Sequence, residues 1–219
     1  MAELDIDAVA GADWGGGVAP FTANTKKLGM WLFLLSDSLT FSTAILAYAY
    51  VRLASSSWPR PFEIYPAIAN ATFLTIILLS SSLTMVLAVA AAHRDEVHKA
   101  VMYIILTAIG GAAFVILHLG EWFRLFAEGV TPWSNQFTVN GQPGDPLFGG
   151  TFFGLTGLHM LHVSIGVIYL CIIAYGFGRR KFNADHVEVS GLYWHFVDLV
   201  WMFIFPMVYL MSVNLNVKS

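Results

Sequence analysis

Charged residues and cysteines are both scarce in this chain of 219 residues. Asp, Glu, Lys and Arg make up only 11% of it, whereas soluble domains carry about 25%. The formal net charge is only −3, which excludes the strongly basic footprint of a nucleic-acid-binding protein. The single cysteine, Cys171, excludes a disulfide framework and a multi-cysteine metal site. An ordinary soluble enzyme is therefore not expected.

Long apolar stretches are abundant instead, since 57% of the residues are hydrophobic. A helix of about 20 residues crosses a bilayer core, and lipid leaves backbone groups no partners outside the segment. The sequence therefore predicts an all-α integral membrane bundle with five transmembrane helices in one domain, residues 28–213. We place the helices at about residues 28–51, 68–92, 100–126, 152–176 and 192–213. Residues 1–27 and 214–219 are expected to be polar tails.

The joining segments predict the orientation in the membrane. The third of them, at about 127–151, is rich in proline and glycine and is expected to form an irregular cap outside the lipid. One side of the membrane receives seven basic residues: Lys26, Lys27, Arg94, Lys99, Arg179, Arg180 and Lys181. The other receives four: Arg52, Arg60, Arg124 and Lys218. The positive-inside rule then predicts a cytoplasmic amino terminus and a periplasmic carboxyl terminus.

Asp37 is a carboxylate near the middle of the first predicted helix, with no basic residue on its own turn. Such a group costs about 2.5–3.5 kcal/mol to insert, so it is expected to face the bundle interior and to have a partner. Two interpretations remain open. Asp37 exchanges a proton or contacts a lipid headgroup, or it is a neutral acid that hydrogen-bonds a neighbouring helix.

Three further predicted helices carry polar pairs with a spacing of three residues, which places each pair on one helix face. The pairs are His118 and Glu121, His159 and His162, and His195 and Asp198. Such a set is typical of a carboxylate–histidine metal site or of axial haem ligation. However, Glu121 is predicted near the outer end of its helix and Asp198 near the inner end of its own. We therefore expect an interhelical polar network and no metal site.

The chain contains no phosphate-binding glycine loop, no activated nucleophile and no pair of matching halves with interrupted helices. By its own residues it is expected to be a helper or scaffold protein without a catalytic centre.

Three segments resemble subunit III of the haem-copper respiratory oxidases. Residues 188–201, EVSGLYWHFVDLVW, are similar to the family pattern of a glutamate, small residues and then Tyr-Trp-His-Phe-Val-Asp-x-x-Trp. Residues 152–163, FFGLTGLHMLHV, are similar to its Phe-Phe-x-x-Thr-Gly-x-His-x-x-His-Val. Residues 28–36, LGMWLFLLS, resemble the start of the helix that carries the family's buried carboxylate.

The resemblance implies a non-catalytic subunit of a proton-pumping terminal oxidase in a bacterial plasma membrane. Haems and copper would belong to partner subunits I and II, with a possible subunit IV, and this chain would hold no cofactor except bound phospholipid. It would stabilise subunit I and support proton uptake, with Asp37 as the buried carboxylate. Arg179, Arg180 and Lys181 become candidates for binding lipid headgroups.

Two departures from the family pattern matter. The family usually has glutamate where this chain has Asp37, and its longer members have seven helices, of which this chain lacks the first two. Cytochrome c is the expected electron donor, with quinol the alternative. An accessory subunit of nitric oxide reductase is a further alternative, and a self-standing membrane haem or metal protein is one from another class. A proton-coupled transporter using Asp37 ranks last.

Overall fold

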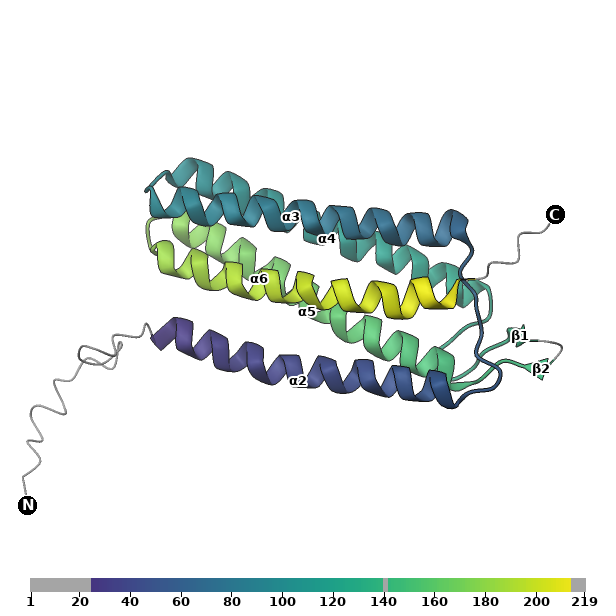
Figure 1. Ribbon diagram of the computed structural model, residues 1–219. Coiled ribbons are helices and arrows are strands. Elements are labelled where there is room, and N and C mark those ends of the chain that lie inside the picture. Colours follow the sequence, from purple (N-terminus) through teal and green to yellow (C-terminus); the bar gives the residue numbers. More distant parts are fainter. Residues whose placement is uncertain (1–24, 140–141, 214–219) are drawn as a thin grey trace, which may run out of the picture.

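The computed structural model describes residues 25–139 and 142–213, which form an elongated bundle of long helices (Figure 1). Its long helices are α2 (Thr25–Ala54), α3 (Ala69–His93), α4 (Val97–Ala127), α5 (Leu147–Gly178) and α6 (Ala184–Ile204). Five helices of the described part are long and apolar enough to cross a membrane, the last running on to Ser212. The predicted all-α membrane fold is confirmed. Most of the predicted tails, 1–24 and 214–219, lies outside the described residues.

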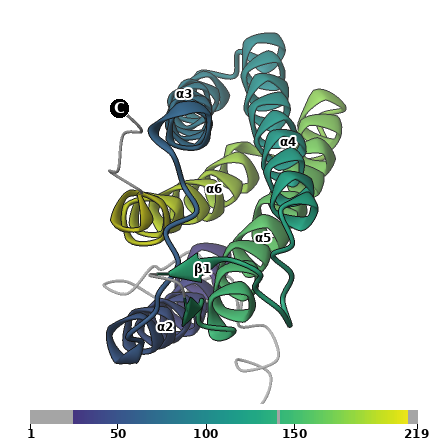
Figure 2. The same cartoon turned by 90° about the vertical axis from the view of Figure 1, so that its right-hand side faces the viewer.

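The helices are not equally enclosed by their neighbours. α3 and α4 pack closely together, α5 and α6 complete the main group, and α2 lies along α5 and α6 (Figures 1 and 2). In the most apolar 18-residue stretch of α2 only 11% of the residues are buried, compared with 44% in the corresponding stretches of α5 and of the last span. Most of the apolar surface of α2 therefore faces away from this chain.

Two helices, α5 and α6, begin well before the starts that hydrophobicity predicted, because polar residues outside the apolar runs cap them. The backbone N–H of Leu147 donates to Asp145 Oδ1 over 2.9 Å at the start of α5. At the start of α6, the side chain of Asn183 and that of His186 form a reciprocal capping box. The predicted starts near residues 152 and 192 were therefore too far inside the helices.

The loops at the end of the bundle where α2 ends contain short regular elements (Figure 1). Strands β1 (Thr138–Val139) and β2 (Gln142–Pro143) pair antiparallel in the predicted cap, which extends over residues 128–146. A π-helical turn, η1 (Ile64–Ile68), leads into α3. The last span changes to a π-turn, η2 (Phe205–Tyr209), and a 3₁₀ turn, η3 (Leu210–Ser212). Pro206 accounts for this change, because it has no N–H for the α-helical bonding pattern.

A glycine allows a close approach between helices in the core. A Cβ atom added to Gly111 of α4 would lie 2.3 Å from Cη2 of Trp194 on α6. Trp194 is 1% exposed, and its Nε1–H donates to Ser81 Oγ of α3 over 3.1 Å. The absence of a side chain at Gly111 therefore leaves room for the Trp194 indole of α6 to reach the backbone of α4.

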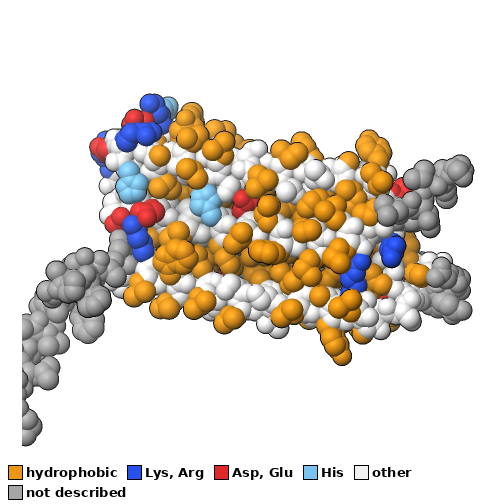
Figure 3. Space-filling view, viewed as in Figure 1, with side chains coloured by type: hydrophobic (Ala, Val, Ile, Leu, Met, Phe, Trp, Pro, Cys, Tyr) orange, Lys and Arg blue, Asp and Glu red, His pale blue; other side chains and the backbone are white. Residues whose placement is uncertain are grey.

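Charged side chains gather at the ends of the bundle, whereas its flank is largely apolar (Figure 3). The start of α2, the α3–α4 turn and the α5–α6 turn share one end, which brings the seven predicted basic residues to the same side (Figure 1).

Candidate functional site

Asp37 and His162 form an ion pair between α2 and α5. The distance from Asp37 Oδ2 to His162 Nε2 is 3.2 Å, without the alignment of an ideal hydrogen bond. Both side chains are mostly enclosed, with exposed fractions of 16% and 14%. The partner that Asp37 was expected to need is thus a histidine on another helix, at mid-height in both.

The second ring nitrogen of His162 determines where a proton lies in this pair. His162 Nδ1 is 2.8 Å from the backbone oxygen of Leu158, so Nδ1 carries the hydrogen and donates it. Two unprotonated atoms at Nε2 and Oδ2 would both be acceptors and would repel each other. The contact is favourable only with one proton between these two atoms, either on the imidazole or on the carboxyl group. In both forms the pair is neutral overall, which lowers the cost of placing it in a membrane.

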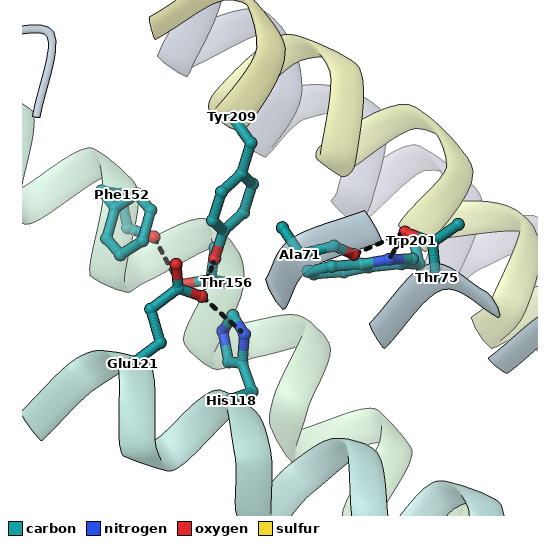
Figure 4. A network of polar contacts seen from close by, with 8 residues as sticks. All are labelled: Ala71, Thr75, His118, Glu121, Phe152, Thr156, Trp201 and Tyr209. Atoms are coloured by element: carbon teal, nitrogen blue, oxygen red, sulfur yellow. Dashed lines mark hydrogen bonds and ion pairs between the residues drawn. The ribbon is translucent and has the colours of Figure 1, made fainter. Parts of the chain in front are cut away.

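A second polar contact involves Glu121, which lies toward the C-terminal end of α4 (Figure 4). Tyr209 Oη donates to Glu121 Oε2 over 3.0 Å, and His118 Nδ1 lies 3.7 Å from the same oxygen. Glu121 is 8% exposed, and His118 and Tyr209 are fully buried. The tyrosine hydroxyl gives this carboxylate a donor from the last span.

His159 lies between these two contacts in an aromatic environment. Its ring stacks on Trp201 with centroids 5.2 Å apart and meets the edge of Phe114 at 5.6 Å. Its two ring nitrogens have no hydrogen-bond partner among the described residues. His159 was predicted as part of an interhelical hydrogen-bonding network, and the structure surrounds it with rings instead.

His195 and Asp198 form a separate polar group with α3. His195 Nδ1 lies 2.6 Å from Ser82 Oγ, and Ser82 is also a hydrogen-bonding neighbour of Asp198. Asp198 is 6% exposed. The predicted polar residues thus divide into several local contacts and do not form one connected network.

The basic residues proposed for lipid headgroups lie at the α5–α6 turn. Arg180 forms an exposed ion pair with Asp95 at 3.3 Å, and the Arg179 guanidinium lies 5.0 Å from the ring centroid of Tyr175. Lys181 follows in the same turn, where its backbone N–H donates to Gly176.

Several residues of these contacts were not singled out from the sequence. Tyr209 and Ser82 are common residue types in apolar segments, so only their position beside a buried acid or histidine distinguishes them. Glu188 was noted within a motif, and its carboxylate joins three helices through Lys27 at 2.8 Å and His93 at 3.3 Å.

The arrangement brings two proton-binding groups, the carboxylate of Asp37 and the imidazole of His162, within 3.2 Å of each other. The described side chains do not form a metal centre. Within residues 25–139 and 142–213, no three His, Cys, Asp or Glu side chains gather so that they could bind a metal ion.

Comparisons with known proteins point to one family. The family model described as cytochrome c oxidase subunit III matches residues 5–213. The chain is 31% identical over 187 residues to the cytochrome bo(3) ubiquinol oxidase subunit 3 of Pseudomonas aeruginosa, covering 84% of each chain. It is 31% identical over 199 residues to the cytochrome c oxidase subunit 3 of Alkalihalophilus pseudofirmus, covering 90% of this chain and 91% of that one. The quinol oxidase subunit 3 of Bacillus subtilis is 30% identical over 211 residues, covering 93% and 98%.

Proposed function

Because the chain belongs to the cytochrome c oxidase subunit III family, we propose that it is the non-catalytic third subunit of a proton-pumping terminal oxidase. The family match over residues 5–213 carries this proposal. Oxygen would be reduced to water in partner subunits I and II, which would hold the haems and copper. The scattered histidines of the described residues favour this division, since they do not assemble a ligand set.

The residues of this chain would stabilise subunit I, bind phospholipid and support proton uptake. The Asp37–His162 pair supports the last role, because a carboxylate and an imidazole are both groups that take up and release protons. The largely open flank of α2 would pack on lipid or on another subunit. Arg179, Arg180 and Lys181 would attract anionic headgroups at about 1 kcal/mol for each charge near the surface.

The protein would reside in the plasma membrane of a bacterium, with the charged end of the bundle in the cytoplasm. The concentration of Lys and Arg at the end where α2 begins supports this orientation.

Cytochrome c is the electron donor that we propose for the complex. Quinol is the second candidate, because relatives named as quinol and ubiquinol oxidase subunits match with the same identity, 30–31%, as one named as a cytochrome c oxidase subunit. The donor site would lie in a partner subunit in either case.

The test is mild purification through a tag at Ser219, followed by a reduced-minus-oxidised spectrum and identification of the co-purifying chains. The proposal expects haem signals that travel with larger partner chains and are absent from this chain once it has been separated from them. A haem signal that remains with the isolated chain would contradict it and would make the histidines ligands. Oxygen consumption with reduced cytochrome c or with quinol then identifies the donor.

A further inference from the structure

The carboxyl-terminal end of α2 is anchored to the last span of the bundle. The Tyr48 side chain is 1% exposed, and its hydroxyl lies 3.3 Å from Ser212 Oγ. Arg52 Nη1 donates to the same serine oxygen over 3.0 Å and to the backbone oxygen of Met207 over 3.3 Å. Hydrogen bonds from a charged donor are stronger than those between neutral groups. This end of α2 is therefore held by buried and charge-assisted contacts.

The amino-terminal end of α2 lies over a pocket instead. None of residues 25–33 is buried. A pocket of about 210 Å³ opens between this part of α2 and the helices α5 and α6. Its lining consists of Met30 and Phe33 of α2, His162, Ile165 and Tyr169 of α5, and Tyr193 of α6. The pocket therefore reaches the histidine that pairs with Asp37.

Exposed polar contacts hold this end of α2 in place. Lys27 Nζ lies 2.8 Å from Glu188 Oε2 of α6, and the two side chains are 34% and 29% exposed. Lys26 Nζ lies 3.1 Å from His186 Nε2 in the first turn of α6. Ion pairs open to water contribute little to stability. These contacts can therefore break while the rest of the fold remains intact.

Hydroxyl groups mark a point of bending between the two ends of α2. Ser36 Oγ donates to the backbone oxygen of Phe33 over 2.9 Å. Ser38 Oγ donates to the backbone oxygen of Leu35 over 2.7 Å. Such bonds compete with the backbone N–H groups for carbonyl oxygens and favour bending of the helix. Asp37 lies between these two serines, so a bend here changes its surroundings directly.

We propose that residues 25–35 of α2 form a lid that bends at Ser36 and Ser38, with the Lys27–Glu188 pair as its latch. Opening the latch widens the pocket and admits water to the carboxyl group of Asp37, whose side chain is 16% exposed in the latched form. The inference deepens the proton-uptake role under the proposed function and rests on it, because a buried acid exchanges protons with the solvent only when water reaches it.

The experiment labels carboxyl groups with a water-soluble carbodiimide and a charged amine, in the assembly in which the tagged chain purifies, held in nanodiscs. Peptide mass spectrometry gives the labelling rate of Asp37 relative to that of Glu63, an exposed residue outside α2. Lys27→Glu is expected to raise this ratio about two- to fivefold, the range that an exposed ion pair accounts for. Adding Glu188→Lys re-forms the latch with exchanged charges and is expected to restore the wild-type ratio.

Arg180→Glu is the matched control for the effect of charge on the reagent. It makes the same change of charge at the same end of the bundle and breaks the exposed pair with Asp95, without touching α2. Equal ratios for Lys27→Glu and wild type, or an equal rise for Arg180→Glu, would overturn the inference. If the Lys27→Glu chain does not assemble, Glu188→Gln breaks the same latch and decides by the same comparison.

Failure of the lid and failure of the proposed function give different results. Unchanged labelling of Asp37 in an assembly that contains the haem-bearing partner chains counts against the lid alone. A preparation that lacks these partner chains counts against the proposed function, whatever the labelling rate of Asp37.

Discussion

Asp37 Oδ2 on α2 lies 3.2 Å from His162 Nε2 on α5, and this pair connects the most exposed helix of the bundle to its core. The pair is neutral as a unit, although each group would be costly alone in a membrane. Removing either partner therefore affects both the attachment of α2 and the capacity to hold a proton.

Asp37→Asn is expected to leave haem content and initial oxygen consumption close to wild type while activity declines faster during sustained turnover. The reason is that the redox centres are expected in other subunits, whereas this pair holds α2 and its surroundings together. His162→Gln should have the same effect. In a double-mutant cycle on thermal stability we expect a coupling energy of about 0.5–3 kcal/mol between the two sites.

Oxygen consumption over time and pyridine haemochrome spectra measure these outcomes. Complete loss of initial activity in a normally assembled Asp37→Asn complex would refute this prediction and indicate direct proton transfer. Additive effects of the two substitutions would show that the pair is not a unit.

Tyr209→Phe is expected to destabilise the protein by about 1–3 kcal/mol, because it removes the donor to a buried carboxylate without changing the ring. Thermal unfolding in detergent, followed by intrinsic fluorescence, measures the effect. Tyr50→Phe is the matched control, since the Tyr50 side chain is 75% exposed. An equal midpoint for Tyr209→Phe and wild type would show that Glu121 does not depend on this hydroxyl.

Gly111→Ala is expected to cost about 1–3 kcal/mol by overpacking, because the added Cβ would lie 2.3 Å from the indole of Trp194. Gly154→Ala makes the same chemical change where nothing lies within 4 Å, so it should be neutral or slightly stabilising. Comparing the unfolding midpoints of the two variants isolates the steric term. Equal midpoints would mean that the Trp194 indole is not tightly packed against Gly111.

Glu96 lies outside the membrane-spanning segments, and we expect its contribution to the stability of the folded protein to be lost in acid. The Lys99 ammonium, which bonds Glu96 at 3.0 Å, holds the pKa of that carboxyl below its ordinary value of 4.5, and Arg94 acts in the same direction. Since the folded pKa is lowered, this contribution is present above pH 4.5 and is lost as the pH falls through the folded pKa. Wild type should therefore lose more stability than Glu96→Gln when the pH is lowered past 4.5. Parallel midpoints of the two proteins across this range would contradict the prediction.

The sequence by itself determined the number of membrane-spanning helices and their approximate positions. The thickness of the bilayer and the need to satisfy backbone groups within each segment act over one stretch of chain, so composition is enough to locate them. The helix starts at Leu147 and Ala184 were placed too late for the same reason, because hydrophobicity does not report capping by Asp145 or Asn183. Asp37 and the histidines could be singled out one by one, since each is unusual among apolar neighbours.

Only the tertiary structure decided which of these groups meet. Tyr209 reaches Glu121 across 88 residues of sequence, and Ser82 reaches His195 across 113. Such contacts depend on how each helix is rotated and where it crosses its neighbours. Helices that are apolar on all sides carry little information about rotation. Local fits such as that of Gly111 against Trp194 distinguish one rotation from another. In the arrangement that results, Asp37 lies beside His162 and His159 lies among aromatic rings.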